Sequence, residues 1–365
     1  MYLKEISIAN FRNYAAALDL EFSSGNNLFL GENAQGKSNL LEGIYYLSLA
    51  HSFRGAQDMD LINFDSSYFL LKGNVIKGKR QQVISVSYSR DKVKQYTVDG
   101  LKGKSISDIV GHFISVIFAP EHLQLVRGAP SLRRKYLDTQ ISMIFPKYYY
   151  YLREYRKVLR QRNEVLKAGH LEGLEIWDHY LAAVGSKIIA ARMQAVKKLA
   201  EIVKESFFRI SGENVELDLR YCSTIGQGEY LKEEKTIYDL YIKKLIQKRS
   251  LEQRLNATII GPHRDDLALV LGGNILKDFG SQGQQRMAVL SLKLAEVNFI
   301  KNHTGEYPVL LLDDVMSELD AKRRKYVLDI LSGIQTFITA TDAGHFSGEF
   351  IEKASVKNIV SGKIV

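Results

Sequence analysis

The sequence predicts an α/β fold with a mixed sheet, an antiparallel β subdomain and an inserted, mainly helical lobe. Three features lead to this prediction. A glycine-rich loop (residues 31–38) joins an apolar strand to a helix, a second apolar strand (309–312) ends in two aspartates, and residues 131–204 are almost free of glycine-rich turns. Strands next to helices indicate a layered domain, and the long helical stretch indicates an insertion. We expect a discontinuous lobe of residues 1–130 and 256–365, and a helical lobe of residues 131–255.

Composition limits the class of protein. The 365 residues are 45% hydrophobic, enough for one large α/β domain with an insertion or for two domains. No apolar run approaches the roughly 18 residues that span a membrane, and the N-terminus enters a strand at once, so we expect a soluble, cytoplasmic protein. The single cysteine, Cys222, excludes an internal disulfide. A net charge of +9 fits an anionic partner, of which nucleic acid is the commonest.

The N-terminal part reads mainly as strands. Apolar residues predict strands over 3–8, 18–22 and 27–30, and a helix over 39–49 that is rich in Leu, Ile and Tyr. Alternating segments at 68–75, 82–88 and 93–98, separated by polar turns, predict an antiparallel meander. A further apolar run at 110–118 predicts another strand.

The middle of the chain reads as helices. Apolar residues at spacings of three and four over 152–166 and 177–202 predict two helices that pack as an antiparallel hairpin, with a break near 169–173. A linker or short strand near 215–221 and a third helix over 234–255 follow. The apolar seam is only a few heptads long, so we expect a compact lobe and no extended coiled coil.

The first of these helices carries a strongly basic segment. Residues 147–167 hold seven basic side chains and two acidic ones, a net charge of +5, and four consecutive tyrosines (148–151) stand at its start. A solvated helix face would explain the charges, and so would a surface that follows a DNA backbone. The basic residues are Lys147, Arg153, Arg156, Lys157, Arg160, Arg162 and Lys167.

The loop at 31–38 fits the phosphate-binding pattern G-x-x-x-x-G-K-[ST]. Such a loop binds phosphate because backbone N–H groups converge at the positive end of a helix. Lys37 is expected to contact the β- and γ-phosphates, and the Ser38 hydroxyl to bind Mg²⁺. The nucleotide-binding stretch comprises Gly31, Glu32, Asn33, Ala34, Gln35, Gly36, Lys37, Ser38 and Asn39.

The last hundred residues supply the remaining chemistry. Strands are predicted over 267–271 and 275–279, a helix from about 282 to 301, and a final strand over 336–340. Asp313, at the end of the strand over 309–312, is expected to hold Mg²⁺ through water, and Asp314 to orient the attacking water. Ser281 and Gly283 suggest a second anion site at a helix N-terminus. Two phosphate sites in one chain predict a two-fold dimer in which each chain completes its partner's site.

Taken together, these motifs resemble the ABC-type ATPases of the SMC-like DNA-repair class. The sequences Asn-Phe-Arg-Asn-Tyr (10–14), Gly-Pro-His-Arg-Asp-Asp (261–266) and Phe-Gly-Ser-Gln-Gly-Gln-Gln-Arg (279–286) are similar to the RecF family of bacterial recombination mediators over essentially the whole chain. The resemblance implies that Arg12 contacts the nucleotide, that Arg54 lies near the phosphates, and that residues 317–320 form the D-loop at the dimer seam. It also implies that Ser281, Gly283 and Gln284 complete the other subunit's site.

The resemblance implies a function as well. Members of this family would bind ATP and Mg²⁺, dimerise on ATP, bind single-stranded DNA and gapped duplex, and help to load RecA together with RecO and RecR. Slow, DNA-dependent ATP hydrolysis would reset the dimer. Its roles would lie in DNA repair, replication and the SOS response.

The sequence departs from the wider ABC pattern at three places. Asp314 stands where many relatives have a catalytic glutamate, which suits slow turnover. Thr341 and Asp342 stand where a switch histidine is expected, with His345 three residues later. The glutamine loop is not evident, and Glu121 or Gln124 is its nearest substitute.

Two other functions share the phosphate loop. A transporter ATPase subunit would need a transmembrane partner for its helical lobe and would have no use for DNA. The Gln-Gly-Gln-Gln sequence at 282–285 and the long basic insertion argue against it. A regulator that binds only nucleotide and protein would show no salt-dependent affinity for DNA.

Overall fold

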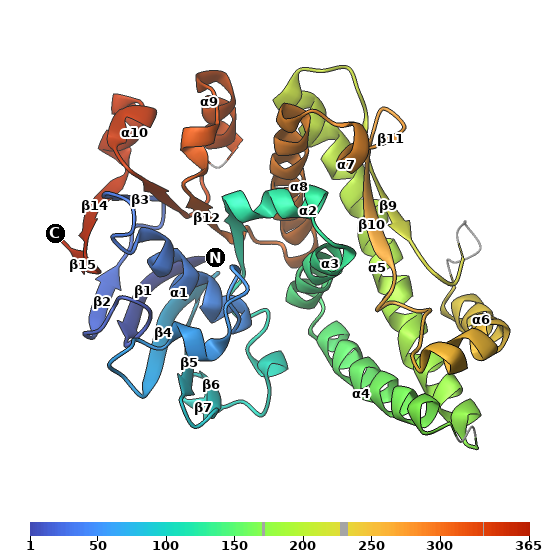
Figure 1. The fold of residues 1–365 in the computed structure, drawn as a ribbon. Helices are drawn as coiled ribbons and strands as arrows, with labels where there is room; N and C mark the ends of the chain where they lie inside the picture. Colours follow the sequence, from blue (N-terminus) through green and yellow to red (C-terminus); the bar gives the residue numbers. More distant parts are fainter. Residues whose placement is uncertain (170–171, 227–232, 331) are drawn as a thin grey trace. The chain divides into compact units, whose positions relative to one another are not determined.

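The computed structural model describes residues 1–169, 172–226, 233–330 and 332–365. The chain forms two compact units, one of residues 1–122 and 296–365 and the other of residues 123–295. Figure 1 shows the first unit as mainly strands and the second as mainly helices. The segment expected to be the helical lobe, residues 131–255, falls within the second unit.

The first unit contains a six-stranded sheet in the order β15-β14-β3-β13-β12-β8. The five strands from β14 to β8 are parallel to one another, and only β15 is antiparallel. The strands β8, β12 and β13 are buried along their whole length, as expected of parallel strands whose sheet is covered on both faces. The strand bounds are β3 (Asn26–Leu30), β8 (Ser115–Phe118), β12 (Val309–Asp313), β13 (Thr336–Ala340), β14 (Ser355–Val360) and β15 (Lys363–Ile364).

The second sheet of this unit is antiparallel throughout, in the order β2-β1-β4-β5-β6-β7. It is the β subdomain that the alternating segments predict. In β4, buried and exposed side chains alternate, so one face packs on the core and the other meets solvent. The bounds are β1 (Tyr2–Ala9), β2 (Leu18–Glu21), β4 (Tyr68–Lys77), β5 (Arg80–Ser89), β6 (Lys94–Val98) and β7 (Leu101–Lys102).

One helix lies at the centre of the first unit. Helix α1 (Lys37–Leu49) contacts strands of both sheets, and nearly all of its side chains are buried. Its run of Leu, Ile and Tyr suits this position in the core, in which Lys37, Glu42 and Ser48 are buried polar exceptions. The unit also contains α9 (Ala321–Ile330) and α10 (Gly348–Lys353).

The second unit contains long helices and a small antiparallel sheet in the order β11-β10-β9. Helix α4 packs against α5, which confirms the expected hairpin, and α6 also packs against α5. The helix α8 (Gln282–Thr304) begins in this unit and ends in the first. The other bounds are α2 (Gln124–Arg127), α3 (Pro130–Ile144), α4 (Pro146–Ala168), α5 (Leu174–Ser211), β9 (Leu217–Cys222), α6 (Glu234–Leu255), β10 (Asp266–Leu271), β11 (Asn274–Ile275) and α7 (Leu276–Phe279).

Three predicted strands need correction. The strand over 275–279 is wrong: only Asn274–Ile275 pair with β10, and the chain then forms α7, which buries Leu276 and leaves Phe279 exposed. The strand over 110–118 is shorter than predicted, because only β8 forms regular pairs. The strand over 336–340 is not the last, since β14 pairs with β3. Among the described residues, no helix is both long enough and apolar enough to cross a membrane.

Candidate functional site

The phosphate loop leaves β3 at Leu30 and enters α1 at Lys37, as the motif predicts. Its two glycines have backbone φ angles that residues with a side chain rarely adopt, +151° at Gly31 and +114° at Gly36. A Cβ at Gly31 would lie 2.4 Å from the carbonyl oxygen of Ile359, and one at Gly36 would lie 2.6 Å from the Asn13 amide nitrogen. Both positions therefore require glycine for backbone conformation and for space.

Lys37 is buried, and its ammonium faces the loop that precedes it. The Nζ donates to the carbonyl oxygens of Gly31 at 2.6 Å and of Glu32 at 2.8 Å. Burial lowers the pKa of Lys37, while Asp314 and Asp313 oppose this shift. The side chain thus places a positive charge beside the N-terminus of α1, where an anion is most favoured.

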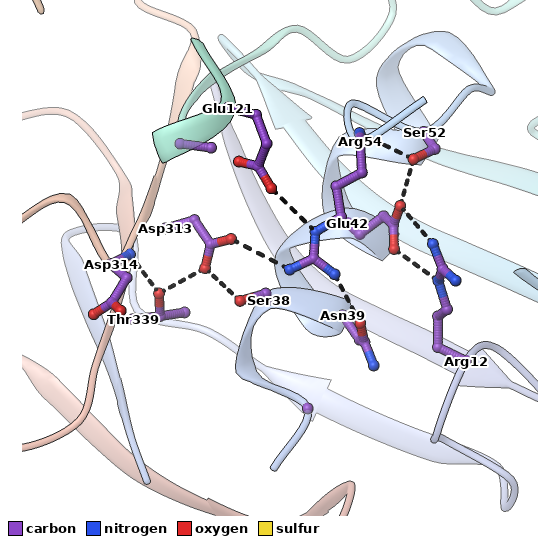
Figure 2. A network of polar contacts seen from close by, with 12 residues as sticks. Arg12, Ser38, Asn39, Glu42, Ser52, Arg54, Glu121, Asp313, Asp314 and Thr339 are labelled. Atoms are coloured by element: carbon purple, nitrogen blue, oxygen red, sulfur yellow. Dashed lines mark hydrogen bonds and ion pairs between the residues drawn. The ribbon is translucent and has the colours of Figure 1, made fainter. Parts of the chain in front are cut away.

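Asp313 ends β12 beside the loop, and three side chains meet its carboxylate (Figure 2). Ser38 Oγ donates to Oδ1 at 2.7 Å, and Thr339 Oγ1 donates to the same oxygen at 2.9 Å. Arg54 approaches the other oxygen, with its Nη2 at 3.7 Å from Oδ2. The carboxylate is almost fully buried, and this burial raises its pKa. Ser38 and Asp313, which are far apart in the sequence, are therefore direct neighbours.

Arg54 reaches two further groups of the site. Its Nη1 donates to Asn39 Oδ1 at 3.2 Å, and its Nε lies 3.9 Å from Glu121 Oε1. Glu121, one of the two expected substitutes for the glutamine of the Q-loop, thus lies against this arginine. Gln124 belongs to the second unit, where it is exposed.

Asp314 has a left-handed backbone conformation, with φ of 55°. Its N–H donates to Thr339 Oγ1 at 3.0 Å, so the threonine hydroxyl links both aspartates. Asp314 lines the same pocket as the phosphate loop. The pocket residues are Asn33, Ala34, Gln35, Gly36, Lys37, Ser38, Asn39, Arg54, Asp314 and Thr339.

Arg12 does not line this pocket, and its guanidinium turns to a buried carboxylate. The Nε donates to Glu42 Oε2 at 2.9 Å and the Nη2 to Glu42 Oε1 at 3.2 Å. The neighbouring Asn13 contacts the phosphate loop directly, since its Nδ2 donates to the Gln35 carbonyl at 3.1 Å. The Asn-Phe-Arg-Asn-Tyr segment therefore supports the loop through Asn13, whereas Arg12 reaches α1.

Ser281, Gly283 and Gln284 lie in the second unit, at the start of α8. The Gln284 N–H donates to Ser281 Oγ at 3.2 Å, and the Ser281 N–H donates to Gln284 Oε1 at 3.1 Å. These reciprocal bonds form a capping box that begins the helix. Gln284 Nε2 also donates to Glu213 Oε2 at 3.2 Å.

The segment after Asp314 is held by local contacts. Ser317 Oγ donates to the Asp314 carbonyl at 2.7 Å, and Asp320 accepts from the Arg323 N–H at 2.9 Å. His345, the nearest histidine to the expected switch position, lies against Arg324 with 2.7 Å between its Nδ1 and the arginine Nη1. The structure therefore gives His345 a contact outside the pocket.

The donor set fits Mg²⁺. Among the described residues, no group of three or more His, Cys, Asp or Glu side chains could hold a metal ion by itself. Mg²⁺ does not need such a cage, because it is commonly held by one or two carboxylates, waters and the phosphates of a nucleotide. Ser38 and Asp313, joined by a 2.7 Å hydrogen bond, supply the hard oxygen atoms that this arrangement uses.

The basic segment lies on α4, and one of its seven basic side chains does not lie at the surface. Six of the seven basic side chains are exposed, but Arg162 is fully buried. Its guanidinium pairs with Asp178 at 2.7 Å and with Glu252 at 2.6 Å, and it donates to Thr258 Oγ1 at 2.7 Å. Arg162 is on the apolar side of α4, so it joins three helices and cannot belong to a surface that follows DNA.

Three residues that the sequence did not indicate belong to this region: Glu42, Ser52 and Thr339. The signal for Thr339 was available in principle, because β12 and β13 are parallel and Asp313 is opposite Thr339 in their register. Glu42 and Ser52 carry no local signal, since their roles depend on contacts with Arg12 and Arg54.

Comparison with known proteins agrees with this geometry. Residues 2–358 match the family model of the RecF/RecN/SMC N-terminal domain. DNA replication and repair protein RecF of Thermoanaerobacter pseudethanolicus is 41% identical over 359 residues, which cover 97% of this chain and 98% of the relative. The chain belongs to the RecF family. The RecF protein of Caldanaerobacter subterraneus subsp. tengcongensis is 42% identical and covers 96% of each chain.

The RecF fold is also confirmed by solved structures. The structure described as the recombination mediator protein RecF-ATP in the RecFOR pathway matches with a TM-score of 0.93 and 40% identity, over 100% of this chain and 97% of that one. An SMC head bound to the C-terminal winged-helix domain of ScpA matches with a TM-score of 0.56 and 15% identity, over 100% of this chain and 97% of that one. The second likeness supports the ATPase-head fold alone, and the predicted α/β fold class is therefore confirmed.

Proposed function

We propose that this chain is an ATP-dependent DNA-binding recombination mediator that acts in DNA replication and repair. The observation that carries the proposal is the Ser38–Asp313 hydrogen bond of 2.7 Å at the mouth of a phosphate loop whose Lys37 faces inward. Similarity to RecF proteins of the RecFOR pathway, one of them in an ATP-bound structure, supports the choice of nucleotide and pathway.

The residues of the first unit have distinct roles in this proposal. The backbone N–H groups at the start of α1 and the Lys37 ammonium bind the nucleotide phosphates. Ser38 and Asp313 hold Mg²⁺, which supplies charge neutralisation at the phosphates. Asp314 orients the attacking water, and its side chain, one methylene shorter than glutamate, is compatible with slow hydrolysis. Arg54 lines the pocket and places positive charge beside the nucleotide, and Arg12 adds positive charge from outside the pocket lining, where it pairs with Glu42.

The second unit contributes in a dimer that ATP induces. Ser281, Gly283 and Gln284 of one copy complete the nucleotide site of the other, and residues 317–320 lie at the seam. The dimer binds single-stranded DNA and gapped duplex, and it assists RecA loading with RecO and RecR. Hydrolysis separates the copies and resets binding.

The exposed face of α4 is the proposed DNA surface. Lys147, Arg156 and Arg160 are exposed there. Arginines and lysines on a helix face bind phosphates by displacing counterions and read no base sequence. Tyr150, which is 49% exposed, has Arg153 over its ring at 5.6 Å, so aromatic surface and positive charge occur together.

Mass measurement in solution tests the nucleotide-gated dimer. Wild-type protein with ATP and Mg²⁺ should shift from monomer to dimer, and Lys37→Ala should remove the shift. Lys79→Ala, which changes an exposed lysine of the same unit, is the matched control and should dimerise as wild type does. Asp314→Asn should accumulate dimer because hydrolysis is blocked. Dimerisation of Lys37→Ala with ATP would refute the model.

DNA affinity is tested with gapped duplex across a salt series, with and without ATP. Neutralising Lys147, Arg156 and Arg160 together should weaken binding and reduce the slope of log affinity against log salt by about two to three units, since each lost phosphate contact removes about 0.9. The control neutralises three exposed lysines of α6: Lys235, Lys243 and Lys248. If ATP produces dimers but no DNA binds at low salt, the protein is a nucleotide-switched binder of other proteins.

A further inference from the structure

A buried carboxylate lies behind the candidate nucleotide site, and two arginine-bearing segments meet it. Glu42 is on α1, five residues after Lys37, and its side chain is 0% exposed. A buried carboxylate is costly unless it is paired and hydrogen-bonded. Glu42 accepts hydrogen bonds from the side chains of Arg12 and Ser52 (Figure 2). Neither partner is close to it in the sequence.

Arg12 is held in a conformation that it would not adopt freely. Its φ is 55°, in the left-handed region, at the tip of the turn where Phe11 and Tyr14 exchange backbone hydrogen bonds. Such a conformation is unfavourable for a residue other than glycine and persists only when its surroundings enforce it. Both carboxylate oxygens of Glu42 accept from the guanidinium. This bidentate contact fixes the direction of the side chain as well as its charge.

The other branch runs through Ser52, which is 2% exposed. Its hydroxyl proton is donated to Glu42, so its oxygen is left to accept the Arg54 N–H at 3.1 Å. The Arg54 guanidinium then reaches Asp313 at 3.7 Å and Asn39 at 3.2 Å. Arg54 is therefore held at both ends: its guanidinium meets Asp313, and its backbone N–H is tied through Ser52 to Glu42.

We propose that Glu42 is a positioning residue: it fixes Arg12, whose neighbour Asn13 contacts the phosphate loop, and it holds the Ser52–Arg54 segment, whose Arg54 lines the pocket. Glu42 does not line the pocket and acts through the two arginine-bearing segments. Because α1 begins at Lys37, one rigid helix carries both the phosphate-binding N-terminus and the anchor for both cations. This inference rests on the proposed nucleotide-binding function.

A purely structural role would produce a different result. The second unit offers a matched pair for comparison, because Arg162 and Glu252 form an ion pair of 2.6 Å in which both side chains are 0% exposed. Glu252→Gln removes the same charge from an equally buried carboxylate far along the chain from the phosphate loop. Stability loss alone should be similar in the two variants, whereas nucleotide affinity separates them.

The experiment compares wild type, Glu42→Gln and Glu252→Gln by ATP affinity, ATPase rate and thermal unfolding. Glutamine keeps the shape of Glu42 but turns an N–H₂ group towards donors, so we expect Glu42→Gln to weaken ATP binding at least tenfold. Glu252→Gln should bind ATP within twofold of wild type. If Glu42→Gln keeps wild-type affinity and ATPase rate with only a lower melting temperature, the inference is overturned.

Two further comparisons separate the branches. A double-mutant cycle compares Arg12→Ala, Glu42→Gln and the double variant. The double variant should lose less ATP-binding free energy than the sum of the two single losses, because Glu42 acts through Arg12. Ser52→Ala leaves the Arg12 branch intact and should weaken affinity less than Glu42→Gln; it also keeps the test open if Glu42→Gln fails to fold. Full additivity would refute the positioning role. A wild-type protein that binds no ATP would refute the proposed function instead.

Discussion

Acid should destabilise the second unit through His263, a histidine that is held neutral. The ring Nε2 lies 3.1 Å from the Thr258 carbonyl, which can only accept, so this nitrogen carries the proton. The Nδ1 then accepts from the Tyr155 hydroxyl at 2.7 Å. Burial lowers the pKa of His263 from 6.5 to about 4, and the positive charges of Arg264, Arg134 and Arg162 act in the same direction.

The sign of the effect follows from proton binding in the two states. Between pH 6.5 and about 4, the unfolded chain protonates His263 and the folded chain does not, so the free energy of unfolding falls as the pH falls. One pKa unit is worth about 1.4 kcal/mol. The full shift corresponds to about 3.4 kcal/mol, lost at up to about 1.4 kcal/mol per pH unit.

Urea unfolding at a series of pH values measures this loss. Trp177, the only tryptophan, lies in the second unit with His263 and reports its unfolding by fluorescence. His263→Gln keeps a donor and an acceptor but cannot titrate, so the difference between wild type and variant isolates this histidine from the aspartates. We expect wild type to lose about 3 kcal/mol more than the variant between pH 6.5 and 4. Equal pH dependence in the two proteins would refute the reasoning.

Three further substitutions test contacts inside the two units. Arg162→Met should lower the free energy of unfolding by about 3–5 kcal/mol, because it removes the ion-pair partner of the buried Glu252 and leaves the buried Asp178 with Arg249 alone. Arg160→Met on the exposed face should change it by less than about 0.5 kcal/mol. Gly31→Ala should destabilise by at least about 2 kcal/mol, since its Cβ would lie 2.4 Å from the Ile359 carbonyl oxygen; thermal unfolding checks this. Thr339→Val removes the hydroxyl that links both aspartates, so it should cost about 1–3 kcal/mol and reduce the ATPase rate, and an unchanged rate would contradict this link.

The sequence predicted those parts of the fold that depend on contiguous residues. The strand, loop and helix around Lys37 form one local unit, and α6 occupies the predicted residues 234–255. The antiparallel meander was equally clear because its polar turns separate alternating strands. Periodicity and turn residues act over a few positions, so tertiary contacts did not have to be known.

Prediction failed where a distant partner decides the role of a residue. Arg162 interrupts an apolar seam, and a positive charge in a basic segment is most simply placed at the surface. It is buried because Asp178 and Glu252, on two other helices, supply opposite charges. Glu42 is a similar case, since its partners Arg12 and Ser52 are on other segments. Only the fold brings such charges together.

The C-terminal strand β14, which the sequence did not predict, changes how the phosphate loop itself is understood. The motif leaves the position of Gln35 free, yet its side-chain Oε1 accepts the Ser361 N–H at 2.6 Å and its carbonyl accepts the Gly362 N–H at 2.8 Å. Both donors are in the turn between β14 and β15. The loop is thus held from outside by backbone N–H groups of the C-terminal turn. Because these contacts use acceptors of the loop and none of its donors, its own N–H groups stay available for phosphate.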